Sequence, residues 1–125
     1  MIVGFGLDLV EIARIERQLA SRTADRFLAR VFTDRERAFC DRFGDRASRY
    51  AARFAAKEAA SKALGVPGGI RFLDVEVVRA DGAPRLVLAG VAAAAASTLA
   101  VARVHVTLSH DGGVAAAAVV LEAAP

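Results

Sequence analysis

In RVHVTLSHDGGVAAAAVVL (residues 103–121), polar and apolar side chains alternate at first and then give way to an almost unbroken apolar run. Val104, Val106 and Leu108 fall on one side of the alternation, which is typical of a strand with one buried face. The glycines at 112 and 113 predict a turn, so we expect residues 114–121 to form the next strand. Because this last strand is nearly all apolar, we expect it to be central and buried on both faces.

A second hairpin is expected upstream of the first one. Residues 72–79 are rich in β-branched side chains, and residues 85–88 form the return strand. Ala80-Asp81-Gly82 between them has the composition of a turn. The alanine-rich residues 90–99 predict a short helix that separates the two hairpins.

The N-terminal half begins with a short predicted strand and continues as helix. The strand covers residues 2–8, and its glycines at 4 and 6 would let another backbone come close. From Glu11 onward, Ile12, Ile15 and Leu19 recur at helical spacing, which predicts an amphipathic helix with a basic outer face.

Two further helices are expected before the hairpins. Thr33-Asp34-Arg35-Glu36 matches a capping box and predicts a helix that ends near Phe43. The next helix is expected over residues 48–64, with Gly65 as its C′ residue and Val66-Pro67-Gly68-Gly69 as a loop. Helices followed by hairpins favour an α+β fold, with N-terminal helices packed on a mainly antiparallel sheet, in one domain over residues 1–125.

Composition limits the classes of protein to consider. No apolar run approaches the roughly 20 residues that a membrane span needs, and the N-terminus lacks the pattern of a signal peptide. Cys40 is the only cysteine, so a disulfide framework is excluded and a reducing, cytoplasmic location is expected. With no histidine close to it in sequence, Cys40 is interpreted as a packing residue.

The positive charge is concentrated in the first half of the chain. Residues 1–62 contain 13 Lys and Arg against 9 acids, whereas residues 63–125 contain 4 against 5. Such a field favours an acidic partner, which could be nucleic acid, an anionic cofactor or an acidic protein, although a solvated helical surface needs no partner. Of 17 basic residues 15 are arginine, and the two lysines, Lys57 and Lys62, lie in one segment.

That segment, RFAAKEAASKALG (residues 53–65), is the richest in chemistry. On a helix, Glu58, Ser61 and Lys62 lie close to one face, while Arg53 and Lys57 form its edge. A carboxylate beside several cations is what a Mg²⁺–phosphate site requires. The alternative is an ordinary ion pair between Glu58 and Lys62 at i,i+4 spacing.

Asp8 and His105 are the other two candidates outside that segment. Asp8 follows a mostly apolar strand, where it is either a cap for the next helix or a metal ligand. His105 lies on the polar side of its strand, as a structural residue or a ligand contact. No HExxH, CxxC, GxGxxG or P-loop motif is present, so zinc-protease, redox, dinucleotide-binding and P-loop functions have no support.

Three stretches together resemble the holo-acyl-carrier-protein synthase group of phosphopantetheinyl transferases. Residues 6–12 (GLDLVEI) are similar to the family's G-[IL]-D-[IL]-x-E-[IL] motif, and residues 53–65 to R-[FW]-[AC]-x-K-E-A-x-x-K-A-[LF]-G. Residues 104–110 (VHVTLSH) resemble the third motif, V-x-[VL]-[ST]-[IL]-[ST]-H. The order, the spacing and the chain length also resemble the family's short type.

The resemblance implies the 4′-phosphopantetheinyl transferase fold and a Mg²⁺-dependent enzyme of fatty acid biosynthesis. Such enzymes move 4′-phosphopantetheine from coenzyme A to a serine of apo-acyl carrier protein and release adenosine 3′,5′-bisphosphate. It implies that Asp8 and Glu58 hold the metal and that Glu58 and Lys62 are catalytic. The implied coenzyme A contacts are Arg53, Lys57, Ser61, Lys62, Gly65 and His105.

The resemblance also implies a homotrimer with active sites at the subunit interfaces and a carrier protein docked on Arg14, Arg17 and Arg22. Asp111-Gly112-Gly113 departs from common members, where bulkier residues are frequent. Two alternatives stay open: a nucleic-acid-binding domain and an inactive coenzyme A-binding scaffold. Seven Phe, one Tyr and no Trp, with basic residues interleaved with acids, argue against nucleic acid, and neither nucleic acid nor a membrane is an expected partner.

Overall fold

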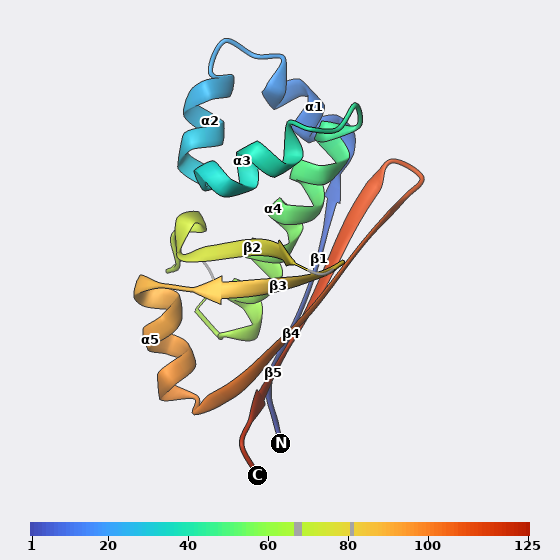
Figure 1. Cartoon of the computed structure of the whole chain (residues 1–125). Helices are drawn as coiled ribbons and strands as arrows, with labels where there is room; N and C mark the ends of the chain where they lie inside the picture. Colours follow the sequence, from blue (N-terminus) through green and yellow to red (C-terminus); the bar gives the residue numbers. More distant parts are fainter. Residues whose placement is uncertain (67–68, 81) are drawn as a thin grey trace.

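The computed structural model describes residues 1–66, 69–80 and 82–125 (Figure 1). The elements follow in the order β1 (Ile2–Glu11), α1 (Ile12–Leu19), α2 (Ala24–Val31), α3 (Asp34–Cys40), α4 (Arg46–Ala63), the 3₁₀ turn η1 (Phe72–Asp74), β2 (Val75–Ala80), β3 (Ala83–Leu88), α5 (Gly90–Thr98), β4 (Val101–Asp111) and β5 (Val114–Ala123).

The predicted C-terminal hairpin is the centre of the main sheet. β5 lies between β1 and β4 and pairs with both in antiparallel fashion, while β2 and β3 form a separate antiparallel hairpin. Gly112 and Gly113 make the two-residue turn between β4 and β5, with φ of 58° and 81° that favour glycine. The expected α+β fold is therefore confirmed, as is the central position of the last strand.

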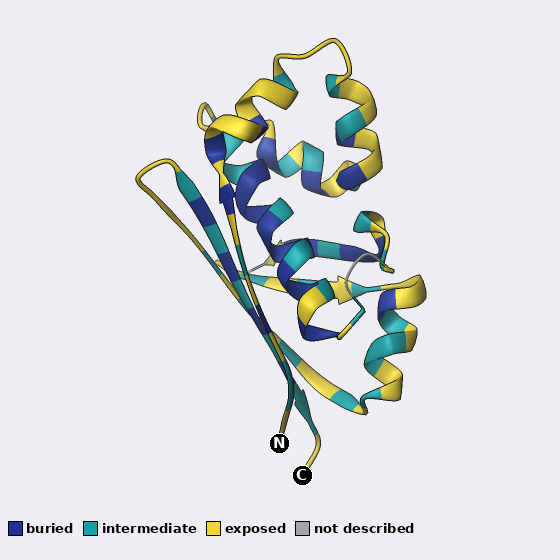
Figure 2. Ribbon diagram, turned by 180° about the vertical axis from the view of Figure 1, so that it is seen from behind, coloured by how far each residue is buried: buried dark blue, intermediate teal, exposed yellow. Residues whose placement is uncertain are grey.

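α4 packs directly against the inner face of this sheet, and β1 is built to admit it. A Cβ at Gly4 would collide with the carbonyl oxygen of Ala63, and a Cβ at Gly6 with that of Ala59. Most buried residues of α4 are alanines, so the helix presents a thin surface to the strand. Figure 2 shows the buried residues concentrated along α4, between the sheet and the other helices.

The local signals for caps and ends are confirmed. Thr33 is the N-cap of α3, and its capping box with Glu36 is complete. α4 ends in a Schellman motif, in which Gly65, at φ 74°, donates to Lys62 O at 3.1 Å and Val66 donates to Ser61 O at 3.3 Å. The predicted loop at Pro67 and Gly68 and the predicted turn at Asp81 lie outside the described residues.

Several elements differ from the predictions. β1 continues three residues past Asp8 to Glu11, because it pairs with β5 along its full length as far as Val114. α2 was not predicted, although Leu28 and Val31 bury one side of it. Residues 72–74 form the 3₁₀ turn η1 before β2 begins.

The last strand is not buried on both faces. Along β5, fully buried residues alternate with half-buried ones, and α4 covers only the inner face. On the outer face of β1, Phe5, Leu7 and Leu9 remain 64%, 52% and 64% exposed. The sheet therefore carries an apolar outer face that this chain leaves uncovered.

Within the described ranges, none of the helices combines the length and the hydrophobicity that crossing a bilayer demands.

Candidate active site

Asp8 lies on the inner side of β1, next to α4. It pairs with Ala117 of β5 within the strand, and its side chain is 16% exposed. The ammonium of Lys62 donates to Asp8 Oδ1 at 3.1 Å and to Leu7 O at 3.0 Å. The alternative role of Asp8 as a helix cap is wrong, because Glu11 is the N-cap of α1.

Glu58 brings a second carboxylate to the same place from α4. Burial raises the pKa of Glu58, the charge of Asp8 raises it further, and Lys62 and Arg14 lower it. These influences place the two carboxylates and two cations within mutual electrostatic range. In residues 1–66 Lys62 pairs with Asp8 and makes no ion pair with Glu58, so the i,i+4 alternative is not what the structure shows.

The donor set fits a magnesium ion that is shared with a phosphate. In the described part of the chain no three His, Cys, Asp or Glu side chains gather as a ligand group, so the protein offers Asp8 and Glu58 alone. Mg²⁺ is commonly held by one or two carboxylates together with substrate phosphates and water. The ammonium of Lys62 at Asp8 Oδ1 also shows that this carboxylate accepts a cation.

A cavity of about 600 Å³ opens beside Glu58. Its lining combines polar and apolar side chains: Arg30, Lys57, Glu58, Ser61, Gly69, Ile70, Arg71, Phe72 and Leu73. Ser61 donates to Val66 O at 3.2 Å and faces the same space as Glu58. Gly65 is exposed at the end of α4. The volume and the cations suit an extended anionic ligand.

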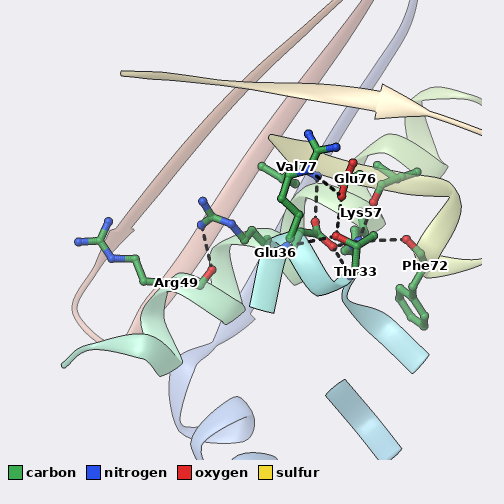
Figure 3. Close-up of polar contacts among 10 residues, drawn as sticks. Thr33, Glu36, Arg49, Lys57, Phe72, Glu76 and Val77 are labelled. Carbon is green, nitrogen blue, oxygen red and sulfur yellow. Dashed lines mark hydrogen bonds and ion pairs between the residues drawn. The ribbon is translucent and has the colours of Figure 1, made fainter. Parts of the chain in front are cut away.

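Lys57, which was predicted to contact phosphate, lines the cavity but has its ammonium turned into the protein. Its ammonium is buried and donates to Glu36 Oε1 at 2.8 Å, Phe72 O at 3.0 Å and Val75 O at 2.6 Å (Figure 3). These three bonds use all the hydrogens that a lysine offers. Removing one partner of such a buried pair typically costs about 3–5 kcal/mol.

Arg53 does not face the carboxylates either. It is buried, donates to Arg49 O at 3.3 Å and places its guanidinium 4.3 Å from the ring centre of Phe39. Burial lowers the pKa of Arg53, and the neighbouring Glu36 opposes that effect. In the single chain α4 therefore turns Arg53 toward α3, and its contact with coenzyme A stays a prediction.

His105 lies across the sheet from the carboxylates. Through β5, both His105 and Phe5 stand opposite Val120, so all three side chains share the outer face. His105 Nε2 contacts Glu122 Oε1 at 3.0 Å. Within one chain the structure does not bring His105 to Asp8 and Glu58.

Of the arginines predicted to bind a carrier protein, Arg14 lies near Glu58. It is exposed on α1, its Cζ lies 5.7 Å from the ring centre of Phe54, and its charge reaches Glu58. Arg17 on α1 and Arg22, in the turn that follows α1, are both exposed. Arg30 on α2 was missed, because α2 itself was not predicted and no motif marks it.

Comparison with known proteins assigns the class. The model of the 4′-phosphopantetheinyl transferase superfamily matches residues 4–119. Since that match spans nearly the whole chain, the protein belongs to this superfamily.

Individual relatives narrow the group. A holo-[acyl-carrier-protein] synthase of Anaeromyxobacter sp. is 72% identical over 98% of this chain and 96% of its own. The Helicobacter pylori holo-[acyl-carrier-protein] synthase, solved in complex with coenzyme A, is 35% identical with a TM-score of 0.82, covering 94% of this chain and 99% of that one. The Bacillus anthracis enzyme is 38% identical with a TM-score of 0.81, covering 99% of both chains. The resemblance stated from the motifs is confirmed.

Proposed function

We propose that this protein is a holo-acyl-carrier-protein synthase. It transfers 4′-phosphopantetheine from coenzyme A to a serine of apo-acyl carrier protein and releases adenosine 3′,5′-bisphosphate. The single observation that carries the proposal is the cluster of Asp8, Glu58 and Lys62, in which Glu58 also lines a cavity that has two arginines in its lining. The 72% identical relative has the same named activity.

In this mechanism Asp8 and Glu58 hold Mg²⁺, which when bound neutralises charge on the pyrophosphate of coenzyme A. The serine hydroxyl of the carrier attacks the β-phosphate, and the bond to the α-phosphate breaks as the nucleotide leaves. Lys62 offsets negative charge on the transferring group. The hydroxyl must also lose its proton, for which Glu58 or a water molecule at the site would serve as the base.

Coenzyme A binding also involves Ser61, Gly65 and, from α2, Arg30. Ser61 and Arg30 line the cavity, and Gly65 lies two residues beyond the end of α4. His105 joins this set only through a neighbouring copy, since its own chain holds it on the far face of the sheet.

The assembly proposed is a homotrimer with active sites between subunits. Its support is the uncovered apolar face with Phe5, Leu7 and Leu9, because such a face on a small chain is a typical interaction surface. His105 stands on that same face, so burying it against another copy would move His105 into a shared cleft.

The acyl carrier protein is proposed to dock on α1, at Arg14 and Arg17, and at Arg22 in the turn that follows. Arg14 is exposed and electrostatically coupled to Glu58, so a partner bound there would place its serine near the carboxylates. A cytoplasmic location and a single domain over residues 1–125 complete the proposal, with the free, buried Cys40 fitting a reducing compartment.

The test is the intact mass of apo-acyl carrier protein after incubation with the enzyme, Mg²⁺ and coenzyme A. The wild-type chain should add one phosphopantetheine group, and omission of Mg²⁺ should prevent it. Asp8→Ala and Glu58→Ala should lose transfer by at least about a hundredfold while keeping the wild-type circular dichroism, since each removes half of the metal's protein ligands. Near-normal activity in either variant would remove the metal assignment.

A further inference from the structure

Lys57 directly precedes Glu58 in α4, yet its side chain points away from the carboxylate cluster into the protein. Its ammonium is fully enclosed and makes three hydrogen bonds to three separate elements. Glu36 belongs to α3, Phe72 to η1 and Val75 to the start of β2. The ammonium of Lys57 therefore connects α4 to α3, η1 and β2.

Glu36 is itself fixed in place on all sides. Its Oε1 accepts from Thr33 N at 2.8 Å as well as from Lys57, and its Oε2 accepts from Val77 N at 2.8 Å. Thr33 Oγ1 in turn donates to Glu76 Oε2 at 2.6 Å (Figure 3). The capping box of α3, the first residues of β2 and the middle of α4 thus form one hydrogen-bonded unit.

This unit connects the two walls of the cavity. Glu58 and Ser61 of α4 form one wall, and Ile70, Phe72 and Leu73 form part of the other. The Phe72 carbonyl, which belongs to the second wall, accepts from Lys57. The ion pair between Lys57 and Glu36 already connects α4 to α3. The hydrogen bonds from Lys57 to the carbonyls of Phe72 and Val75 additionally connect α4 to the second cavity wall and to β2.

We propose that Lys57 is a positioning residue for phosphopantetheine transfer, which holds the 70–73 wall against α4 and fixes Glu58 opposite Asp8. The proposal rests on the proposed function. β1 is already fixed against α4 by the close contacts at Gly4 and Gly6. With β1 fixed, α4 could still rotate about its axis, and the distance between α4 and residues 70–73 could still change. The hydrogen bonds of the Lys57 ammonium restrict both movements.

The main test compares Lys57→Met with Leu121→Ala, a core truncation in β5 four residues beyond the partner of Asp8. Both variants should lose thermal stability, so the decisive readouts are ligand affinities measured well below either melting temperature. Mn²⁺, followed by electron paramagnetic resonance in the presence of coenzyme A, is the probe for the metal. Lys57→Met should weaken Mn²⁺ binding and raise KM for coenzyme A by about ten- to a hundredfold, as supporting residues around metal ligands commonly do.

Leu121→Ala should change neither affinity by more than about twofold, since Leu121 is not among the residues that line the cavity. Because both variants lose stability, a difference in affinity between them cannot come from stability alone. KM for the carrier protein should stay near the wild-type value in both variants. Lys57→Met with affinities equal to those of Leu121→Ala would overturn the positioning role.

Glu36→Gln keeps the test decisive if Lys57→Met does not fold. It leaves the lysine in place but removes the charge that anchors it, so hydrogen exchange should speed up at residues 70–76 and Mn²⁺ affinity should fall at least about threefold. Unchanged exchange and affinity in a folded Glu36→Gln variant would also overturn the role. If the wild-type chain itself fails to modify a carrier protein, both proposals fall, whereas wild-type transfer with unaffected variants defeats only this one.

Discussion

At the scale of single residues, the two lysines of α4 show how position on a helix decides a side chain's task. Lys57 and Lys62 are five residues apart, which places them about 140° apart around the helix axis. Lys57 is buried against Glu36, while Lys62 is half exposed against Asp8. The same ammonium group therefore joins elements of the fold at one position and faces the carboxylate cluster at the other.

Cys40 gives a prediction at the same scale. Burial, opposed by Arg53, raises the pKa of the Cys40 thiol to about 12 from 9.0. The native thiol should resist iodoacetamide at pH 8, because the thiolate is the reactive form, whereas the chain unfolded in guanidinium chloride should be alkylated. Mass spectrometry after timed quenching measures both rates, and native labelling as fast as unfolded labelling would contradict the raised pKa.

The same shift has a consequence for stability. Between pH 9 and 12 the folded chain keeps a proton on Cys40 that the unfolded chain loses, so this residue's contribution to stability falls as pH rises through that window. Cys40→Ala removes the group and should flatten that part of the stability–pH curve relative to the wild-type chain.

At the scale of elements, the contact between β1 and α4 depends on the absence of side chains. Gly6→Ala would push a methyl group into the backbone of Ala59. We expect it to destabilise the fold by at least about 1–3 kcal/mol, the usual cost of overpacking. Gly44→Ala is the matched control, since nothing lies within 4 Å of the added Cβ, and its stability should stay within about 1 kcal/mol of wild type.

Urea unfolding followed by circular dichroism compares the two glycine variants. Equal midpoints for Gly6→Ala and Gly44→Ala would contradict the close contact between Gly6 and the Ala59 carbonyl. Asp8 is two residues from Gly6 on the same face of β1. A displacement of β1 from α4 in Gly6→Ala should therefore also weaken transfer activity.

α1 is the element to which the carrier protein is proposed to bind. Arg14→Glu should raise KM for the carrier protein far more than KM for coenzyme A, by roughly ten- to a hundredfold, or about 1–3 kcal/mol. The effect should shrink as salt rises, because exposed charges are screened beyond about 10 Å at 0.1 M.

Arg85→Glu makes the same charge change at an exposed position of β3 and serves as the control. It should leave both KM values near those of the wild-type chain. Equal changes in the two KM values for Arg14→Glu, or none, would place the docking surface elsewhere.

At the scale of the whole molecule, the uncovered outer face of the sheet predicts assembly. Light scattering at micromolar concentration should give about three times 13.1 kDa. Leu7→Asp puts a charge in the middle of the apolar face, where Leu7 is 52% exposed in the single chain, and should shift the chain toward monomer with loss of coenzyme A binding. A fully active monomer would defeat the trimer, because His105 would then have no route to the site.

The sequence alone determined whatever depends on neighbours along the chain. The alternation of residues 103–109, the paired glycines at 112 and 113, the capping box at Thr33 and the C′ glycine at 65 each predicted the local structure that is observed. The glycines at 4 and 6 even indicated a close backbone approach. Asp8 and Glu58 were singled out because carboxylates beside an apolar strand or among cations are unusual, and the motifs linked them to one family.

Only the tertiary structure decided which polar side chains face the cavity. A 3.6-residue period predicts which residues share a face, but it does not say whether that face meets solvent, a strand or another helix. Lys57 and Arg53 were therefore expected to contact coenzyme A, whereas in the single chain packing turns them toward α3, and Arg30 was missed although α2 places it in the lining of the same cavity as Glu58. Likewise, a nearly all-apolar strand predicted burial on both faces, whereas the single chain covers one face and leaves the other uncovered, because burial depends on what packs there and not on the strand itself.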